Sequence, residues 1–310
     1  MPKKKTVIVT GGAGFIGSHV VDELVARGWQ VHVADDLSTG FRSHVNRKAK
    51  LYILDIRSDR FRNLVLRMRP TAVVHLAAHI DLRSSVAMPK HDADINIIGG
   101  LNVLEACRNA EVKHLVFASS AAVYGRTAKL PAKETSPTGP NSPYGISKAT
   151  FEEYLRFAQD AYGVDSAVLR FANVYGPRQT VQGEAGVVAT FLSRLMSGKS
   201  VTVNGDGRQT RDFIYVGDVA RMVATAVSRS LSGVFNVSTG KETSVNGLYK
   251  EICEAAKFHK EAAHGPAKAG DERRVSLSPV KALRATGWKA KVDVKTGIRK
   301  TYEWWREEIG

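Results

Sequence analysis

Tyr144 and Lys148 are spaced so that they could do acid–base chemistry together. Residues four apart lie on one face of a helix, which places the phenol and the ammonium about 6 Å apart. A cation at that distance lowers the pKa of a phenol, and the phenol can then exchange protons near neutral pH. The spacing is common by chance, so an exposed surface pair is the alternative.

Two serines favour the catalytic interpretation. Ser119 and Ser120 end an apolar run in the segment FASSAAVYG. A hydroxyl there can hydrogen-bond the same substrate oxygen that the phenol deprotonates. Beside a nucleotide site, a serine, a tyrosine and a lysine at the edge of a sheet are typical of hydride transfer.

The glycine-rich segment TGGAGFIG predicts such a nucleotide site. Gly11, Gly14 and Gly17 follow the apolar run 7–9 and lead into a helical pattern. Glycines at these positions permit a tight turn, close approach of the backbone to a pyrophosphate and close packing of helix on sheet. The helix N-terminus adds N–H donors for an anion. A purely structural turn is the alternative.

Acidic residues follow the next two strands. Asp35 comes about twenty residues after the glycines, where a carboxylate can accept hydrogen bonds from the adenosine ribose and repel a 2′-phosphate. This position favours NAD over NADP, although a helix cap or turn residue is the alternative. Asp55 and Ile56, after the third strand, are expected to flank the adenine.

These residues need a parallel sheet to position them. Apolar runs alternate with helical patterns up to residue 170, as in a parallel sheet covered by helices on both faces. Ligands of such sheets bind at the carboxyl ends of the strands. We therefore predict an α/β fold, a Rossmann-type doubly wound parallel sheet, with strands at 6–9, 30–34, 72–76, 114–118 and 165–170 and helices at 15–27, 58–68, 97–110 and 144–162.

The alternation breaks beyond residue 175. We predict helices at 187–197, 217–228, 244–257 and 293–307 and strands at 201–203 and 234–237. The predicted dinucleotide-binding domain is 1–175, to which segments of about 213–240 return. Residues 176–310 are predicted to form mainly a smaller C-terminal substrate-binding lid.

Composition limits the class of protein. The 310 residues are 43% hydrophobic and 24% charged, with no long uncharged apolar run. A cytoplasmic globular protein that makes no membrane contact is expected. Cys107 and Cys253 are the only cysteines, and no His cluster has ligand spacing, so neither a disulfide nor a metal is predicted. The net charge of +15 is dispersed and lacks interleaved aromatic residues, so no nucleic-acid partner is expected.

Further motifs carry a resemblance along essentially the whole chain. They are HLAA at 75–78, Asn96, SSAAVYG, YGISK, RFANVYGPRQ and RDFIYVGDVA. Together with TGGAGFIG, they resemble the extended short-chain dehydrogenase/reductases, and most of all their nucleotide-sugar 4-epimerases. The resemblance implies NAD that stays bound through turnover and a UDP-sugar substrate. It also implies a homodimer joined by a bundle of helices 97–110 and 148–162.

The resemblance also assigns residues by position. It implies catalytic roles for Ser120, Tyr144 and Lys148. It implies NAD contacts from Gly11, Gly14, Phe15, Ile16, Gly17, Asp35, Asp36, Leu37, Ser38, Thr39, Gly40, Asp55, Ile56, Leu76, Ala77, Ala78, Asn96, Ser119, Tyr144, Lys148, Phe171 and Val174. Substrate contacts are implied for Ser85, Ser120, Tyr144, Asn173, Val188, Thr202, Val203, Asn204, Arg211 and, from the basic stretch 268–273, Arg273. For Arg211, a simple ion pair with Asp212 is the alternative.

One departure selects the reaction. Members of the family that dehydrate or decarboxylate the sugar carry an acidic residue just before V-Y-G, where this chain has Ala121 and Ala122. An alanine cannot move a proton, so we expect epimerisation at C4 of a UDP-hexose, such as UDP-glucose or UDP-galactose, through a 4-keto intermediate. A UDP-N-acetylhexosamine or UDP-uronate substrate, a dehydratase or a decarboxylase are the alternatives. In another class, the alternative is a non-enzymatic nucleic-acid-binding protein.

Overall fold

The computed structural model of the protein describes residues 5–126, 129–181, 186–267 and 272–309. The chain forms two compact units. Unit 1 consists of Met1–Gly125, Pro137–Arg170 and Ala220–Phe235, and unit 2 of Arg126–Ser136, Phe171–Val219 and Asn236–Gly310. The chain therefore passes between the two units several times.

Unit 1 is built on a seven-stranded sheet with the strand order β11-β6-β5-β4-β1-β2-β3. The central strands pair in parallel, with Val7 of β1 opposite both Val31 of β2 and Ala72 of β4. Their apolar side chains are fully buried, as expected of a sheet covered on both faces. The strands are β1 (Thr6–Thr10), β2 (Gln30–Asp35), β3 (Lys50–Ile53), β4 (Ala72–His75), β5 (His114–Ser120), β6 (Asp165–Phe171) and β11 (Gly233–Val237).

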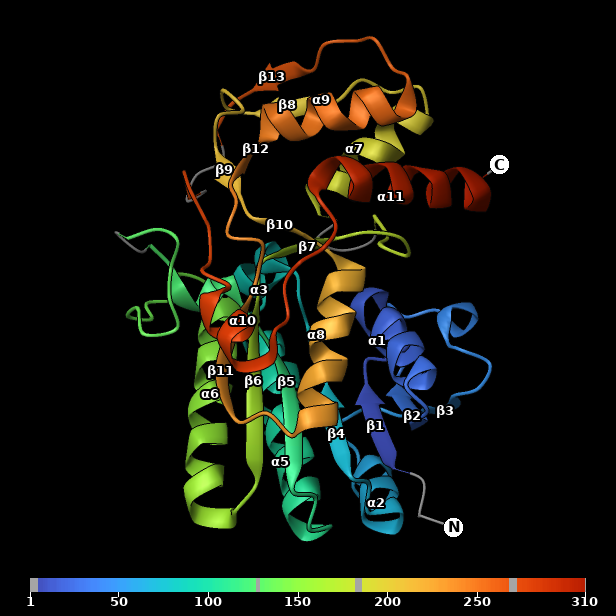
Figure 1. Cartoon of the computed structure of the whole chain (residues 1–310), viewed down its shortest axis with the longest axis vertical. Coiled ribbons are helices and arrows are strands. Elements are labelled where there is room, and N and C mark those ends of the chain that lie inside the picture. The colour runs from blue at the N-terminus through green and yellow to red at the C-terminus, as the bar shows by residue number, and fades with distance from the viewer. Residues whose placement is uncertain (1–4, 127–128, 182–185, 268–271, 310) are drawn as a thin grey trace. The chain divides into compact units, whose positions relative to one another are not determined.

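Helices cover both faces of this sheet (Figure 1), which confirms the predicted fold class. On one face α2 (Asp59–Met68), α5 (Gly99–Asn109) and α6 (Pro143–Tyr162) pack their apolar sides onto a core that includes Ile8, Val73 and Leu115. On the other face lie α1 (Phe15–Ala26) and α8 (Val216–Arg229). The Arg27 side chain just after α1 donates a hydrogen bond to Thr225 Oγ1 of α8 at 3.2 Å.

Local sequence sets the ends of the helix that carries Tyr144 and Lys148. The Ser142 hydroxyl caps α6 by accepting from the Gly145 amide at 3.1 Å, and Pro143 occupies the first turn. Gly163, with φ of +64°, ends the helix in the left-handed conformation that favours glycine. The predicted catalytic tyrosine, Tyr144, is therefore the second residue of the helix.

The predicted helix 97–110 begins earlier than expected. The chain is already helical in α3 (Leu82–Ala87) and α4 (Pro89–Ala93), and a π-helical turn at Asp94–Ile98 leads into α5. A π turn inserts an extra residue and breaks the 3.6-residue pattern on which the prediction relied. The earlier start brings Asp92 and Asn96 into the interior of unit 1.

Unit 2 has its own apolar core. Helices α7 (Val187–Met196), α9 (Val245–Ala256) and α11 (Val294–Ile309) contribute buried side chains such as Leu192, Leu248 and Ile298. A short helix, α10 (Val280–Thr286), precedes α11. Three two-stranded pairs complete the unit: β7 (Asn173–Tyr175) with β10 (Phe213–Tyr215), β9 (Thr210–Arg211) with β12 (Thr243–Ser244), and β8 (Thr202–Asn204) with β13 (Ala263–Gly265).

No helix of the described residues is both long and apolar enough to span a membrane.

Candidate active site

The glycine turn joins β1 to α1 and has the shape that a dinucleotide needs. Gly11 has φ of +68°, and a Cβ on it would lie 2.7 Å from the Ala77 nitrogen. A Cβ on Gly17 would lie 2.0 Å from the Gly11 carbonyl oxygen, so only glycine lets the helix approach the turn. Helix α1 begins after Gly14, and no side chain of the described residues caps it. Its first N–H groups can therefore donate to a phosphate.

The structure shows that a further glycine of this turn is required. A Cβ on Gly12 would lie 2.8 Å from Val33 Cγ1 of β2. Gly12 could not be assigned a role from the sequence, because its contact is with a strand about twenty residues later in the chain.

Asp35 connects the end of β2 to the glycine turn. Its Oδ2 accepts a hydrogen bond from the Ala13 amide at 2.9 Å, and its Oδ1 accepts from the Leu37 amide at 2.9 Å. Burial raises the pKa of this carboxyl, and these two hydrogen bonds oppose the rise. Asp36 is exposed and accepts from both the amide and the hydroxyl of Ser38. The predicted NAD residues 35–40 thus form one turn beside the glycines.

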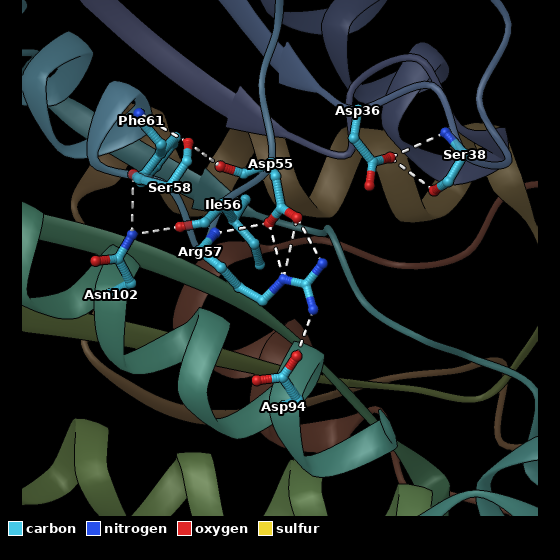
Figure 2. A network of polar contacts seen from close by, with 9 residues as sticks. All are labelled: Asp36, Ser38, Asp55, Ile56, Arg57, Ser58, Phe61, Asp94 and Asn102. Atoms are coloured by element: carbon cyan, nitrogen blue, oxygen red, sulfur yellow. Dashed lines mark hydrogen bonds and ion pairs between the residues drawn. The ribbon is translucent and has the colours of Figure 1, made fainter. Parts of the chain in front are cut away.

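Asp55 and Ile56 begin a second polar network (Figure 2). Both Asp55 carboxylate oxygens accept from Arg57 Nε at 3.0 Å, and the guanidinium lowers the pKa of Asp55. Arg57 Nη1 also pairs with Asp94. The Ile56 carbonyl accepts a hydrogen bond from the side-chain Nδ2 of Asn102. Arg57 was not predicted from the sequence, since its second partner lies 37 residues away.

The end of β4 is fixed by a buried histidine. Thr10 Oγ1 accepts from the amides of Leu76 and Ala77, both at 3.2 Å, and lies 2.8 Å from His75 Nδ1. Burial, with a smaller effect of the Lys148 charge, lowers the pKa of His75 to about 3, so this ring is neutral. Leu76, Ala77 and Ala78 follow as half-buried residues at the carboxyl edge of the sheet.

The predicted catalytic residues lie at the end of β5 and in the first turns of α6, all in unit 1. Ser120 is the last residue of β5, and its Oγ accepts from the Ala122 amide at 3.2 Å. Lys148 Nζ lies 5.7 Å from the centroid of the Tyr144 ring and donates to the Ala118 carbonyl at 2.9 Å. Burial lowers the pKa of Lys148 to about 8, opposed by the charges of Asp92 and Glu152.

Two predicted cofactor residues form hydrogen bonds with other parts of unit 1. Asn96 pairs with the backbone of His79, accepting from its amide at 2.8 Å and donating to its carbonyl at 2.9 Å. The Ser119 hydroxyl donates to Glu152 at 2.5 Å, and Glu152 forms a buried ion pair with Arg170. Neither Glu152 nor Arg170 was predicted. Arg170 opens the motif RFANVYGPRQ, but its partner Glu152 lies 18 residues earlier in the chain.

The predicted substrate residues divide between the units. Ser85 is fully buried in α3 of unit 1, and its hydroxyl accepts from the Tyr144 amide at 3.4 Å. Val188 and Val203 lie in the core of unit 2, so their side chains pack internally. The other predicted substrate residues of unit 2 are Asn173, Thr202, Asn204, Arg211 and Arg273, and the predicted NAD residues Phe171 and Val174 belong to this unit as well.

Two arginines of unit 2 are already engaged. Arg211 Nη1 donates to the carbonyls of Thr210 and Glu272, each at 2.8 Å. Arg273 forms a bidentate ion pair with Asp206, from Nη1 to Oδ1 at 2.8 Å and from Nη2 to Oδ2 at 2.9 Å. This pairing lowers the pKa of Asp206 to about 2. Residues 268–271 of the predicted basic stretch lie outside the described part of the chain.

Known proteins match this chain over nearly its full length. The model of the NAD dependent epimerase/dehydratase family matches residues 7–238. The UDP-glucose 4-epimerase of Thermotoga maritima, solved with UDP-glucose, is 42% identical and covers 98% of this chain and 100% of its own, with a TM-score of 0.94. The Thermus thermophilus UDP-glucose 4-epimerase, solved with NAD, is 44% identical, with coverage of 97% and 99% and a TM-score of 0.91.

A third solved structure differs in its stated substrate. The UDP-N-acetylglucosamine 4-epimerase of Methanobrevibacter ruminantium is 34% identical and covers 99% of both chains, with a TM-score of 0.93.

Proposed function

The chain belongs to the NAD-dependent epimerase/dehydratase family, and from this membership we propose that it inverts C4 of a UDP-hexose and so interconverts UDP-galactose and UDP-glucose. One observation carries the proposal. Ser120 is followed by Ala121 and Ala122 in the short turn at Ala121–Tyr124, within the same unit as Tyr144 and Lys148. The site offers a base for oxidation of the 4-hydroxyl, but these two positions offer none for a later step.

NAD is the cofactor of the family, and the relative from Thermus thermophilus was solved with it. When bound, it accepts the hydride from C4 and supplies it again. In our proposal the glycine turn holds the pyrophosphate, Asp35 the adenosine ribose, and the network of Asp55 and Arg57 the adenine end. The edge residues 76–78 and Lys148 line the path towards the nicotinamide.

The chain's own residues then move one proton. Tyr144, as phenolate, takes the proton of the 4-hydroxyl while the hydride leaves C4, and Ser120 donates a hydrogen bond to the same oxygen. The Lys148 ammonium stabilises the phenolate. The 4-keto sugar then rotates in the site and presents its other face. Tyr144 returns the proton to O4, and the hydride returns to that other face of C4. One proton and one hydride leave and return, so no reductant is consumed.

Arg211 and Arg273 are proposed to hold the diphosphate. The pair of Arg273 with Asp206 is exposed, with side chains 61% and 49% accessible. Exposed pairs contribute little because water and salt screen the two charges. A diphosphate with two negative charges can therefore compete with Asp206 for the Arg273 guanidinium.

A UDP-N-acetylhexosamine is a second candidate substrate. The relative named as a UDP-N-acetylglucosamine 4-epimerase shares the fold along nearly the whole chain. The chemistry at C4 is the same for both sugars, so the two candidates differ only in the pocket for the 2-substituent.

We further propose that two copies associate through α5 and α6. Ile146, Phe157 and Tyr162 of α6 are 49%, 54% and 41% exposed, which gives this helix an apolar outer side. Helix α5 packs beside it, and Ile98, directly before α5, is 54% exposed. Apolar side chains that face solvent on neighbouring helical segments are typical of an interface.

Product analysis tests the proposed reaction. The purified protein is incubated with UDP-galactose, UDP-N-acetylgalactosamine and a UDP-uronate, without added reductant, and the products are separated. We expect the C4 epimer of at least the first sugar. Tyr144→Phe should lower the rate by about 10²–10⁴-fold, whereas Tyr154→Phe, an exposed tyrosine of the same helix, should not. A dehydrated or decarboxylated product would overturn the proposal.

A further inference from the structure

The π-helical turn at Asp94–Ile98 places a carboxylate inside unit 1. Asp92, at the end of α4, is 1% exposed, and Asn96, within the turn, is 4% exposed. π turns in helices are rare and are concentrated at functional sites. Asp92 belongs to none of the sequence motifs of the predicted site, so its burial needs another reason.

The Asp92 carboxylate is only partly satisfied by hydrogen bonds. Its Oδ1 accepts from Asn96 Nδ2 at 3.1 Å and lies 3.3 Å from His79 Nδ1. Its Oδ2 is buried and has no hydrogen-bond partner among the described residues. A buried carboxylate in this condition is costly unless an opposite charge lies near it.

Lys148 supplies that opposite charge, and it is itself a buried charge that an opposite charge would stabilise. It is 4% exposed, and burial is the main cause that lowers the pKa of its ammonium. The charge of Asp92 is the largest effect in the other direction, ahead of Glu152. The phenol of Tyr144 and the neutral ring of His75 also face this ammonium. The Ala118 carbonyl accepts its hydrogen bond at 2.9 Å, and the Phe117 ring centroid lies 4.8 Å away.

Glu152 is less able to compensate Lys148 than Asp92. Its carboxylate is shared with the Arg170 guanidinium, which it meets at 2.5 Å, and with the Ser119 hydroxyl. The groups at Asp92 are the amide of Asn96 and the ring of His79, which is charged only when protonated. Asp92 therefore lies in the better position to offset the lysine charge.

We propose that Asp92 is a positioning residue that keeps Lys148 protonated in the interior and, through Asn96, fixes the π turn against α6. Asn96 Nδ2 also donates to Ser147 Oγ at 3.1 Å, which ties the turn to the residue next to Lys148. This inference rests on the proposed function, in which the lysine must be an ammonium for Tyr144 to act as a base.

The test is a direct titration of Lys148. Protein with lysine labelled at the ε-carbon is titrated by NMR, and the Lys148 signal is assigned by its absence from Lys148→Arg. Because Asp92→Asn removes a negative charge, it disfavours the ammonium. We expect the Lys148 midpoint to fall by about one pH unit or more. Asp92→Glu should bring it back towards the wild-type value. Glu153→Gln, an exposed carboxylate on the same helix, should leave it unchanged.

The rate profile is measured in parallel on the NAD-loaded enzyme. Loss of the lysine proton ends activity at high pH, so the alkaline limb of kcat/KM should move to lower pH in Asp92→Asn by the same amount. An unchanged Lys148 midpoint in folded Asp92→Asn would overturn the inference. If the Lys148 midpoint falls in Asp92→Asn but the wild-type protein converts no UDP-sugar, the role of Asp92 is supported and the proposed reaction is rejected. Thermal melting establishes that both Asp92 variants are folded.

Discussion

At the scale of the residue, buried charges in unit 1 connect parts of the chain that are distant in sequence. Asp35 holds the glycine turn and its own turn through two backbone hydrogen bonds, with Ala13 and Leu37. Its carboxylate also lies where the adenosine ribose is proposed to bind. A substitution at Asp35 therefore affects both the turn and the choice of cofactor.

Asp35→Asn should reduce the preference for NAD over NADP. A 2′-phosphate would no longer meet a negative charge, and we expect the ratio of the two dissociation constants to change by about tenfold or more, which corresponds to about 1.4 kcal/mol. Calorimetric titration of each cofactor measures this ratio. Asp59→Asn removes an equally negative but 78% exposed side chain of unit 1 and is the matched control. If the ratio stays the same in Asp35→Asn, Asp35 does not face the ribose.

Sequence patterns could predict residues whose chemistry depends on near neighbours. The pairing of Tyr144 with Lys148 and the glycine turn are of this kind, because both follow from local helix geometry. Arg57, Glu152 and Asp92 could not be predicted in this way. Each of them has a partner that is distant in sequence, and only the folded chain brings the two together.

At the scale of the element, the unit of β1, the glycine turn and α1 depends on close backbone approach. The three predicted glycines follow from the motif, while Gly12 is explained only by its contact with Val33 on the neighbouring strand. Likewise, the periodic pattern located helix 97–110, but the π turn before it shifts the apolar face and hides the true start at Pro89.

Gly17→Ala should disrupt the glycine turn. The added methyl would lie 2.0 Å from the Gly11 carbonyl, so the backbone must move. Overpacking of this kind costs about 1–3 kcal/mol. We expect a lower melting temperature and loss of NAD from the purified protein. Gly139→Ala is the control, because its nearest contact is at 4.0 Å. A Gly17→Ala protein that retains its full complement of NAD would show that the turn tolerates the methyl.

At the scale of the whole molecule, the net charge of +15 and the apolar outer side of α6 are the features that sequence patterns explain least. The positive charges are dispersed, and the fold does not require a binding partner for them. In the proposed dimer, the second copy covers the apolar side of α6, so side chains such as Phe157 would be removed from solvent.

Phe157→Glu should separate the proposed dimer. A carboxylate at this position would be buried without a partner, and such burial is strongly unfavourable. Light scattering coupled to gel filtration should show a dimer for the wild type and a monomer for the variant. Leu66→Glu, an exposed leucine on α2, should remain a dimer. A monomeric wild type would rule out the association.

The central claim is that one hydride leaves C4 and returns to C4 of the same sugar. The most direct measurement uses UDP-galactose deuterated at C4 and mass spectrometry with NMR of the product. We predict UDP-glucose that keeps the deuterium at C4, with no release of reduced cofactor. Loss of the label to solvent, or a product whose C4 is not inverted, would contradict the account.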